Sequence, residues 1–509
     1  MRLIFLFCFL LLSFNASAQD KPPLTIIAEE WPSYTNADLT GTYWDIIRAI
    51  YGDDYQLNLK TVSWKKALNN VSAKQADIII GVYRGQRADI LIPEYHIDMD
   101  SALYILYDDS LHNINSLADL ENLTIAGRNH YVSTDILPQS TTFYAVDSVK
   151  GINKLIFNQR IDGALVFALD VYSADPSGTL SIKRLTSKRK MYLGFADTPR
   201  AQKLMDQFDK KMQQLLAENK IKPLFNEAVY YEFAGFNHRE AQPTISLQLI
   251  TSIYDKHQQT LITTKQDRHT ASLLAEELPQ YNFDIQLSSV RVVSEEMKNL
   301  TASTCVVGFA KKPTRMGSYL FSLPIYTYIK PRLILLEENN SLIPTQALTD
   351  NTISIEKLFS AASTFRLASM DNSDAYTALK NVLSTQQYQR IFNIDAGPTK
   401  NILALLLAKR IDALVLWPHE LSNIIDSTID VNKLVSYEIS ESIGNNINTY
   451  IACNNTPTNT EFIAAVNSLL QQEKFPDTLF NDLLRRLDPQ SAMAFMDRLA
   501  ISETPEKQR

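Results

Sequence analysis

A ten-residue pattern occurs twice in the chain. Residues 158–167 read NQRIDGALVF, and residues 408–417 read AKRIDALVLW. Each copy holds Arg-Ile-Asp, an apolar run and a closing aromatic residue, which is Phe167 in the first copy and Trp417 in the second. One match of this kind can arise by chance, because an acidic residue before a buried strand is common.

A second pair of segments repeats in the same order. Each begins with an apolar strand, continues through a glycine and a polar loop, and ends in Pro-x-Tyr: GVYRGQRADILIPEY (81–95) and GFAKKPTRMGSYLFSLPIY (308–326). The polar loops carry Arg87 and Arg315. Two repeats in one order predict that the chain contains two copies of one unit.

Strand-like and helix-like segments alternate along each copy. The apolar run LTIIA (24–28) is followed by a helical pattern at 43–50, and a buried strand is predicted at 76–82. This alternation predicts parallel sheets covered by helices, and it restarts at LTIAG (123–127), which predicts a second lobe. We therefore predict the α/β fold class, with two tandem units of two α/β lobes each.

The predicted boundaries follow from where the periodicity fails and restarts. A chain of 509 residues has room for several domains. The predicted segments are a signal peptide at 1–18, a first unit at 19–229, a linker at 230–243, a second unit at 244–497 and a tail at 498–509.

The first residues have the pattern of a secretory signal. Arg2 precedes an apolar run at 3–12, and Ala16-Ser17-Ala18 is a small-residue cleavage site. An uncleaved anchor is the alternative, but the run is well short of the roughly 20 residues that span a bilayer. We expect an exported, periplasmic protein whose mature chain is not inserted in a membrane.

Composition excludes other classes of function. The net charge is −7, from 49 basic and 56 acidic residues, so no basic footprint for nucleic acid is expected. The seven histidines are scattered without metal-ligand spacing, and we expect no metal and no cofactor. After cleavage Cys305 and Cys453 remain, and export permits a disulfide between them; the sequence leaves their pairing open.

At this point the chain resembles the family 3 type of bacterial periplasmic substrate-binding proteins, the two-lobed venus-flytrap receptors of amino acid uptake. The resemblance rests on motifs in the order of that family: EEWPSY (29–34), GTYWDII (41–47), ADIIIGVYRGQR (76–87), SLADLENLTIAGRNHYVSTD (116–135) and the repeated ten-residue pattern. The segments STCVVGFAKKPTR and YIACNNTP of the second half are similar to a branch of the same superfamily. The resemblance implies two tandem venus-flytrap units that bind a small molecule, with a membrane permease or a membrane sensor as possible partner.

The resemblance also implies which residues contact the ligand. The family's loop arginine grips a ligand carboxylate, which suits a guanidinium fork, and Arg87 and Arg315 stand in its place. A surface ion pair between Arg87 and Asp89 is the alternative. The other candidates line the expected cleft: Arg84, Trp31, Tyr34, Tyr43, Arg128, Tyr131, Ser133, Phe167 and, in the second unit, Trp417.

One departure from the family bears on the ligand. Phe167 and Trp417 stand where amino acid receptors place the aspartate that holds the ligand's ammonium group, and an aromatic ring cannot replace that charge. We therefore expect a small anionic or aromatic metabolite, carboxylate-bearing, in place of an ordinary amino acid. The second unit lacks Trp-Pro and Gly-x-Tyr-Trp, so the first is expected to be the better binder. An exported dehydratase-like enzyme, or a non-binding interaction module, is the alternative function.

Overall fold

A computed structural model describes most of the chain. The described residues are 21–128, 136–239, 241–255, 260–311, 316–370, 379–381, 383–394, 400–424, 430–441, 447–472, 480–481 and 483–502. The predicted signal peptide lies outside these ranges. The chain divides into two compact units, residues 1–96 with 192–224 and residues 97–191 with 225–509.

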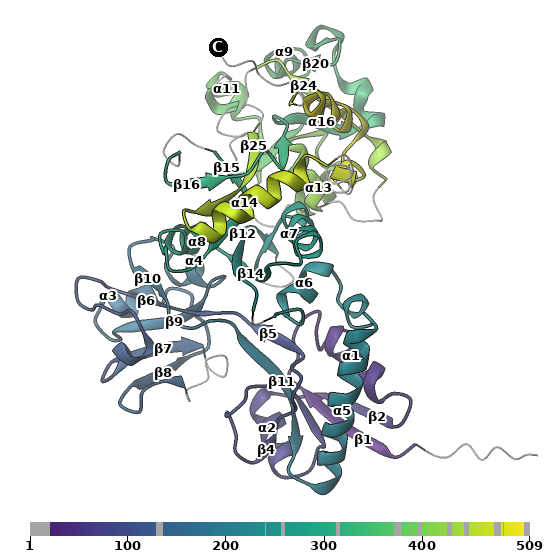
Figure 1. Ribbon diagram of the computed structural model, residues 1–509. Coiled ribbons are helices and arrows are strands. Elements are labelled where there is room, and N and C mark those ends of the chain that lie inside the picture. Colours follow the sequence, from purple (N-terminus) through teal and green to yellow (C-terminus); the bar gives the residue numbers. More distant parts are fainter. Residues whose placement is uncertain are drawn as a thin grey trace, which may run out of the picture. The chain divides into compact units, whose positions relative to one another are not determined.

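The first sheet belongs to the unit that starts the chain. Its strand order is β2-β1-β3-β11-β4, and β1 runs parallel to β2 and β3 but β11 runs antiparallel to β3. The strands are β1 (Pro23–Ala28), β2 (Gln56–Thr61), β3 (Ile78–Val82), β4 (Ile90–Leu91) and β11 (Arg189–Ala196). Helices α1 (Thr42–Tyr51) and α5 (Pro199–Ala217) pack side by side on it (Figure 1), and α2 (Trp64–Ser72) leads into β3.

The second sheet carries the first copy of the repeated pattern. Its order is β10-β6-β9-β7-β8, with β9 antiparallel to β6 and parallel to β7. The strands are β6 (Leu103–Tyr107), β7 (Thr124–Arg128), β8 (Thr142–Val146), β9 (Gly163–Phe167) and β10 (Ser181–Arg184). Short helices α3 (Asn153–Phe157) and α4 (Val171–Ala174) flank β9.

The third sheet repeats the order of the first. The sequence β14-β12-β15-β25-β16 has the same parallel and antiparallel pairs, and β17 pairs with β25 as β5 (Asp98–Asp100) pairs with β11. The strands are β12 (Thr244–Asp255), β14 (Asn282–Ser288), β15 (Thr304–Ala310), β16 (Tyr319–Phe321), β17 (Tyr326–Tyr328) and β25 (Ile447–Asn454), with β13 (Thr260–Thr263) added at the edge. Helices α6 (Ala228–Phe233), α7 (Lys265–Glu277), α8 (Val290–Glu296) and α14 (Pro457–Leu470) belong to this lobe.

The fourth sheet repeats the order of the second. Its path β24-β18-β23-β21-β22 has the same pairing senses as β10-β6-β9-β7-β8. The strands are β18 (Arg332–Leu336), β21 (Leu367–Met370), β22 (Phe392–Ile394), β23 (Ala413–Leu416) and β24 (Leu434–Ile439), extended by β19 (Leu348–Thr349) and β20 (Thr352–Ile353). The remaining helices include α9 (Ile355–Ala361), α11 (Thr385–Tyr388), α12 (Lys400–Leu407), α13 (Pro418–Ile424) and α16 (Pro489–Ser502).

This recurrence of strand order gives the fold class. The first and second sheets make up one two-lobed α/β repeat, and the third and fourth sheets make up the next, as the predicted tandem architecture requires. These tandem repeats differ from the two compact units, because residues 97–191 cluster with residues 225–509. The boundaries 229, 243 and 497 stay predictions; α6 occupies residues 228–233, and Tyr231 within it is buried.

The repeated ten-residue pattern has one structural role in both copies. Asp162 accepts a hydrogen bond from the backbone N–H of Thr124 at 2.7 Å, and Asp412 accepts one from that of Arg366 at 2.8 Å. Each aspartate thereby ties β9 or β23 to the start of its parallel neighbour, β7 or β21. Two residues after the end of the helix that precedes each strand stands a residue with left-handed φ, Gln159 (52°) after α3 and Lys409 (55°) after α12.

Cys305 and Cys453 form a disulfide that joins β15 to β25, with their Cα atoms 4.0 Å apart. The structure thus answers a question that the sequence left open. Among the residues described, no helix is long and apolar enough to cross a membrane.

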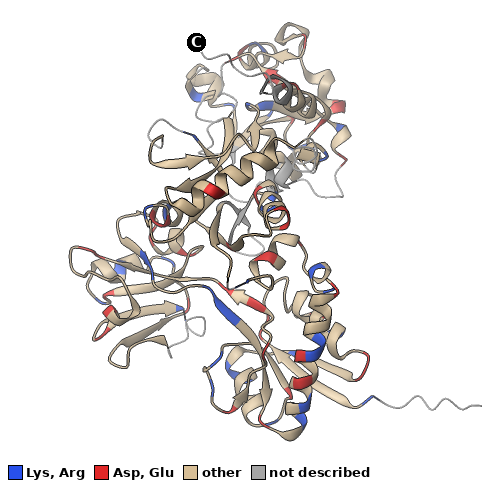
Figure 2. Cartoon of the chain, in the orientation of Figure 1, with Lys and Arg blue, Asp and Glu red and all other residues tan. Residues whose placement is uncertain are grey.

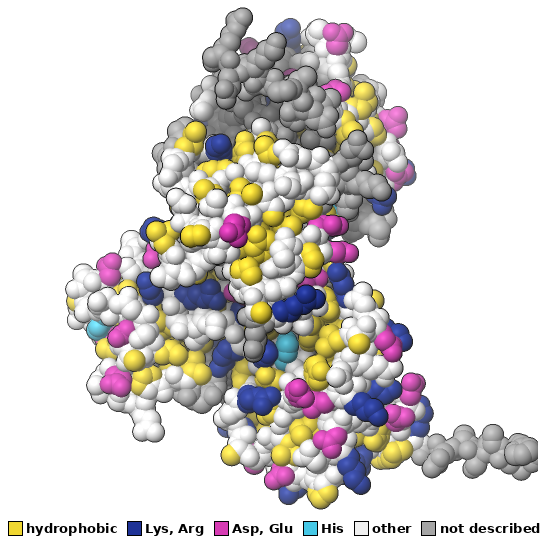
Figure 3. Space-filling model, in the orientation of Figure 1, with side chains coloured by type: hydrophobic (Ala, Val, Ile, Leu, Met, Phe, Trp, Pro, Cys, Tyr) yellow, Lys and Arg dark blue, Asp and Glu magenta, His cyan; other side chains and the backbone are white. Residues whose placement is uncertain are grey.

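Charged side chains of both signs are mixed along the chain (Figure 2). On the face drawn in Figure 3 dark-blue and magenta side chains lie among one another, and neither sign covers that face alone.

Candidate ligand-binding site

Trp31 is held over the end of β3 by its own loop. Its N–H donates to Thr35 Oγ1 at 3.0 Å, and its carbonyl accepts from the N–H groups of Tyr34 and Thr35. The indole lies against Gly81, where an added Cβ would stand 2.2 Å from Trp31 Cη2. Gly81 also has φ of +101°, so both the backbone conformation and the close approach require glycine.

Three further aromatic rings gather around Trp31. Tyr43 is buried at the start of α1, with its ring centroid 6.3 Å from that of Trp31 and 4.7 Å from that of Tyr34. Trp64, the first residue of α2, lies 6.0 Å from Trp31. The structure therefore brings together the predicted residues Trp31, Tyr34 and Tyr43. These rings follow the carboxyl ends of β1 and β2, the edge where open α/β sheets bind ligands.

Sequence reasoning missed Trp64. Its contact with Trp31 joins the segments that follow the neighbouring strands β1 and β2, and a local pattern does not report such a contact. Its position directly after β2, the strand beside β1, is the signal that could have found it.

The two arginines of the loop after β3 have partners in the same lobe. Arg87 makes a two-pronged ion pair with Asp89, at 2.9 Å from Nε and 2.8 Å from Nη2, and Nη2 also donates to Ser72 Oγ at 3.0 Å. The hydrogen bond from Arg87 lowers the pKa of Asp89 below its ordinary value. Arg84 donates to the carbonyl of Pro93 at 2.8 Å and lies over the ring of Tyr192. Ligand contact by either arginine stays a prediction.

Arg128, at the end of β7, forms an ion pair with Asp170. Its Nη2 stands 2.8 Å from Asp170 Oδ1, and burial raises the pKa of that carboxyl against the opposing charge of Arg128. Phe167 closes β9 half-buried against the apolar cluster that includes Leu103 and Ile105. Tyr131 and Ser133, predicted beside them, lie outside the described residues.

In the second unit a polar pair takes the place that Trp31 has in the first. Gly308 stands in β15 as Gly81 stands in β3, with φ of +75°. An added Cβ there would meet Asp267 Oδ1 at 2.5 Å and the Tyr326 hydroxyl at 2.8 Å. Tyr326 donates a hydrogen bond to Asp267, and burial raises the pKa of Asp267 to about 6.

Trp417 is buried near His419 and Tyr328, and Tyr328 is the ring that lies beside Tyr326. The Trp417 ring centroid lies 5.6 Å from that of His419, and His419 stacks on Tyr328 at 3.6 Å. Tyr328 in turn lies 5.1 Å from Tyr326. Burial lowers the pKa of His419 to about 3. Arg315, the predicted carboxylate clamp of this unit, lies outside the described residues.

Within the described ranges, no group of three or more His, Cys, Asp or Glu side chains is placed to hold a metal ion. Trp31, Tyr34, Tyr43 and Trp64 form one cluster of aromatic rings, and Arg87 and Arg128 each pair with a carboxylate within their own lobe. Aromatic rings can stack on a flat or apolar group, and a guanidinium fork can bind a carboxylate.

No family model and no curated protein matches the chain. Among solved structures, the Bordetella pertussis BvgS periplasmic domain is 14% identical and covers 94% of both chains, with a TM-score of 0.32. The Streptococcus pneumoniae amino acid ABC transporter substrate-binding protein AbpA, bound to L-arginine, is 13% identical and covers 40% of this chain and 94% of its own, with a TM-score of 0.30. The Thermotoga maritima arginine-binding protein ArgBP, as a P235GK mutant, is 12% identical over 40% and 93%, also with a TM-score of 0.30. Because these TM-scores are low, the fold class rests on the strand order of the four sheets.

Proposed function

We propose that the protein is an exported, periplasmic solute-binding protein whose first unit closes on a small carboxylate-bearing metabolite, for uptake or for sensing. The observation that carries the proposal is the aromatic group of Trp31, Tyr34 and Tyr43 held against Gly81 at the carboxyl edge of the first sheet. Aromatic walls with a few placed polar groups are the usual lining of small-molecule sites.

Arg87 supplies the carboxylate specificity in this proposal. Asp89 occupies both prongs of its guanidinium fork, as a ligand carboxylate would. Both side chains are exposed, so the pair is held weakly and a ligand carboxylate can displace Asp89 at small cost. Arg128, which forms an ion pair with Asp170 at the end of β7, is a further proposed ligand contact.

Two further features support a ligand that is not an ordinary amino acid. Phe167 is packed against an apolar cluster and offers no charge for an ammonium group. Asp170, the nearest acid along the chain, is paired with Arg128. The second unit, whose corresponding place is filled by Asp267 and Tyr326, serves in this proposal as a docking or regulatory module for a membrane permease or sensor.

A thermal-shift screen of carboxylates, short peptides and aromatic acids tests the proposal. A ligand that binds only the folded state adds about 2.7 kcal/mol to the free energy of unfolding at a concentration 100 times its Kd, and this raises the melting temperature. Arg87→Ala should abolish the shift produced by a carboxylate hit. Arg48→Ala, which removes another exposed arginine of the same lobe with its own partner Asp45, should keep it.

A shift that survives Arg87→Ala rejects the carboxylate clamp. The enzyme alternative is examined with the same hits by mass spectrometry after long incubation. Recovery of unchanged ligand favours a binding protein, and a new product favours a dehydratase-like enzyme.

A further inference from the structure

Largely buried ion pairs join residues 97–191 to the second unit, residues 225–509, and this contact is called the seam below. Lys188 lies in the segment between β10 and β11, and its side chain is only 3% exposed. Its Nζ donates to the carbonyls of Phe233 at 2.5 Å and Ile285 at 3.1 Å, and stands 3.7 Å from Asp284 Oδ1. The ammonium group also lies 3.6 Å from the centre of the Phe233 ring. Every partner of Lys188 in this set comes from residues 225–509.

Arg184 extends the seam along β10. Its Nη2 lies 3.4 Å from Asp284 Oδ2, and its Nη1 lies 3.6 Å from Glu296 Oε2 on α8. The Glu296 side chain is 6% exposed, and burial raises the pKa of its carboxyl against the charge of Arg184.

A fourth ion pair crosses the seam with the signs reversed. Arg291 of α8 stands 2.7 Å from Asp175, whose side chain is fully buried and also accepts from Ser177 Oγ and the N–H of Leu180. Because cations and anions face each other in both directions, a shift of register would bring like charges together. The seam therefore specifies one orientation of the two surfaces.

Apolar packing accompanies these charges. Val292 of α8 is fully buried within the cluster of the second sheet, beside Tyr104, Leu106 and Ile182. Met99 of β5 lies against Gly235, where an added Cβ would stand 2.8 Å from the methionine sulfur. Buried apolar contacts thus lie beside the ion pairs of the seam.

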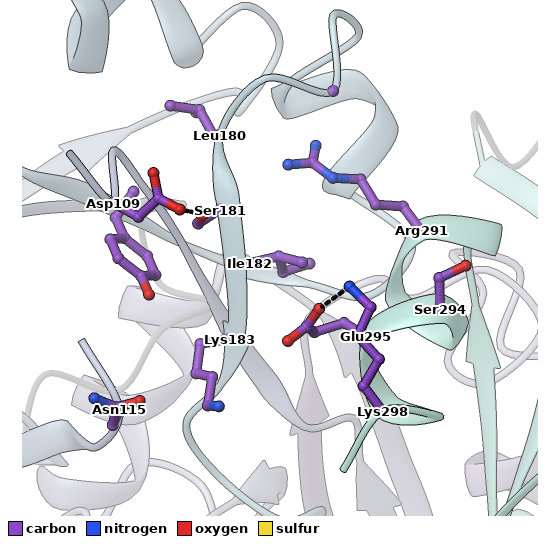
Figure 4. A pocket seen from close by; sticks show the side chains of 12 residues that line it. Asp109, Asn115, Leu180, Ser181, Ile182, Lys183, Arg291, Ser294, Glu295 and Lys298 are labelled. Carbon is purple, nitrogen blue, oxygen red and sulfur yellow. Dashed lines mark hydrogen bonds and ion pairs between the residues drawn. The ribbon is translucent and has the colours of Figure 1, made fainter. Parts of the chain in front are cut away.

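A polar cavity of about 470 Å³ flanks this seam. Figure 4 shows Ser181, Ile182 and Lys183 of β10 on one wall, and Arg291, Ser294 and Glu295 on the other. Glu295 and Lys298 form an ion pair with each other, so this pair does not cross the seam.

We propose that residues 97–191 and residues 225–509 move and unfold together as one structural unit, held together by the ion pairs of Lys188, Arg184 and Asp175. The sequence neighbours of residues 97–191, which are residues 21–96 and 192–224, form a separate compact unit, and the boundary falls at 96/97 and 191/192. A ligand that displaces residues 97–191 would displace the second unit with them; that consequence rests on the proposed function, whereas the coupling does not.

Hydrogen exchange of the whole chain without ligand tests the coupling. Lys188→Met removes a buried cation and its hydrogen bonds to Phe233 and Ile285, and in the described part of the chain it leaves Asp284 with only its contact to Arg184 as an ion pair, so it should lower amide protection at least about tenfold. The loss should appear in both β6 and β14, on the two sides of the seam, and leave β1 and β3 unchanged. Lys190→Met is the matched control: Lys190 is exposed, forms no ion pair among the described residues, and should behave as the wild type.

A second experiment needs no substitution. Reduction of Cys305–Cys453 loosens the third sheet, which belongs to the second unit. Coupling predicts that β6 and β9 lose protection together with β15 while β1 and β3 keep theirs. The proposal is overturned if Lys188→Met matches Lys190→Met, if its effect stays on one side of the seam, or if β6 and β9 are unchanged on reduction. Because no ligand is used, these results are independent of the test with Arg87→Ala.

Discussion

At the scale of single residues, Gly81 decides whether the aromatic group can form. Its φ of +101° and the 2.2 Å approach of Trp31 to an added Cβ are separate obstacles to a side chain. Gly85 in the same loop isolates the first obstacle, because it has φ of +86° and nothing within 4 Å of an added Cβ.

Gly81→Ala should therefore cost more than Gly85→Ala. Each substitution carries about 1–3 kcal/mol of backbone strain, and the collision with Trp31 should add about 1–3 kcal/mol at Gly81 alone. Urea unfolding of both variants measures the difference in stability. Equal losses would mean that the Trp31 loop yields easily and that Gly81 does not position it.

Asp267 predicts a pH dependence within the second unit. Burial raises its pKa to about 6, so the folded state holds the proton more tightly than the unfolded state does. Its stabilising contribution is complete below the ordinary aspartate pKa and is lost as the pH rises through 6. The difference amounts to about 3 kcal/mol.

His419 opposes this trend, because its pKa near 3 makes the folded state lose stability as the pH falls below its ordinary value. The comparison of wild type with Asp267→Asn removes the His419 contribution, which both proteins share. As the pH rises from about 4 to about 6.5, we expect the difference between their stabilities to shift in favour of Asp267→Asn. Urea unfolding at several pH values measures this difference, and parallel stability curves over that window would show that Asp267 does not titrate there.

At the scale of elements, the sequence predicted strands well where apolar runs are bounded by polar residues. The predicted strand 24–28 differs from β1 by one residue, the predicted strand 76–82 contains β3, and the predicted strand 123–127 is shifted by one residue from β7. The sequence did not reveal what the repeated Asp contributes, because its partner is a backbone N–H about 40 residues away. It also could not separate the two roles of Arg87, since both ligand contact and the Asp89 pair place a carboxylate on the same fork.

The repeated aspartate predicts a measurable cost. Asp162→Ala leaves the N–H of Thr124 without its acceptor at the start of β7, and should cost about 1–3 kcal/mol. Asp147→Ala, an exposed control with no such bond among the described residues, should change stability by less than about 0.5 kcal/mol. Chemical denaturation measures both. An Asp162→Ala value as small as that of the control would remove the proposed role of the repeat.

At the scale of the whole molecule, the repeats in the sequence predicted the tandem architecture. They did not predict how the chain divides into compact units. Sequence order places residues 97–191 with the first unit, whereas buried pairs such as Lys188 with Asp284 place them with the second. Such pairs join positions about 100 residues apart, and no local pattern reports them. The same limit applies to Asp267 and Tyr326, whose meeting over Gly308 depends on the third sheet.

Tryptophan fluorescence tests the central claim of ligand binding by the first unit most directly. Only four tryptophans are present, and the proposal places Trp31 against the ligand. Titration with a carboxylate hit from the thermal-shift screen should change the emission in a saturable way. Trp31→Phe should remove most of that change, and Arg87→Ala should show no saturable change over the concentrations that saturate the wild type. An emission change of the same size in Trp31→Phe, or none in the wild type at a saturating concentration, would contradict binding at this site.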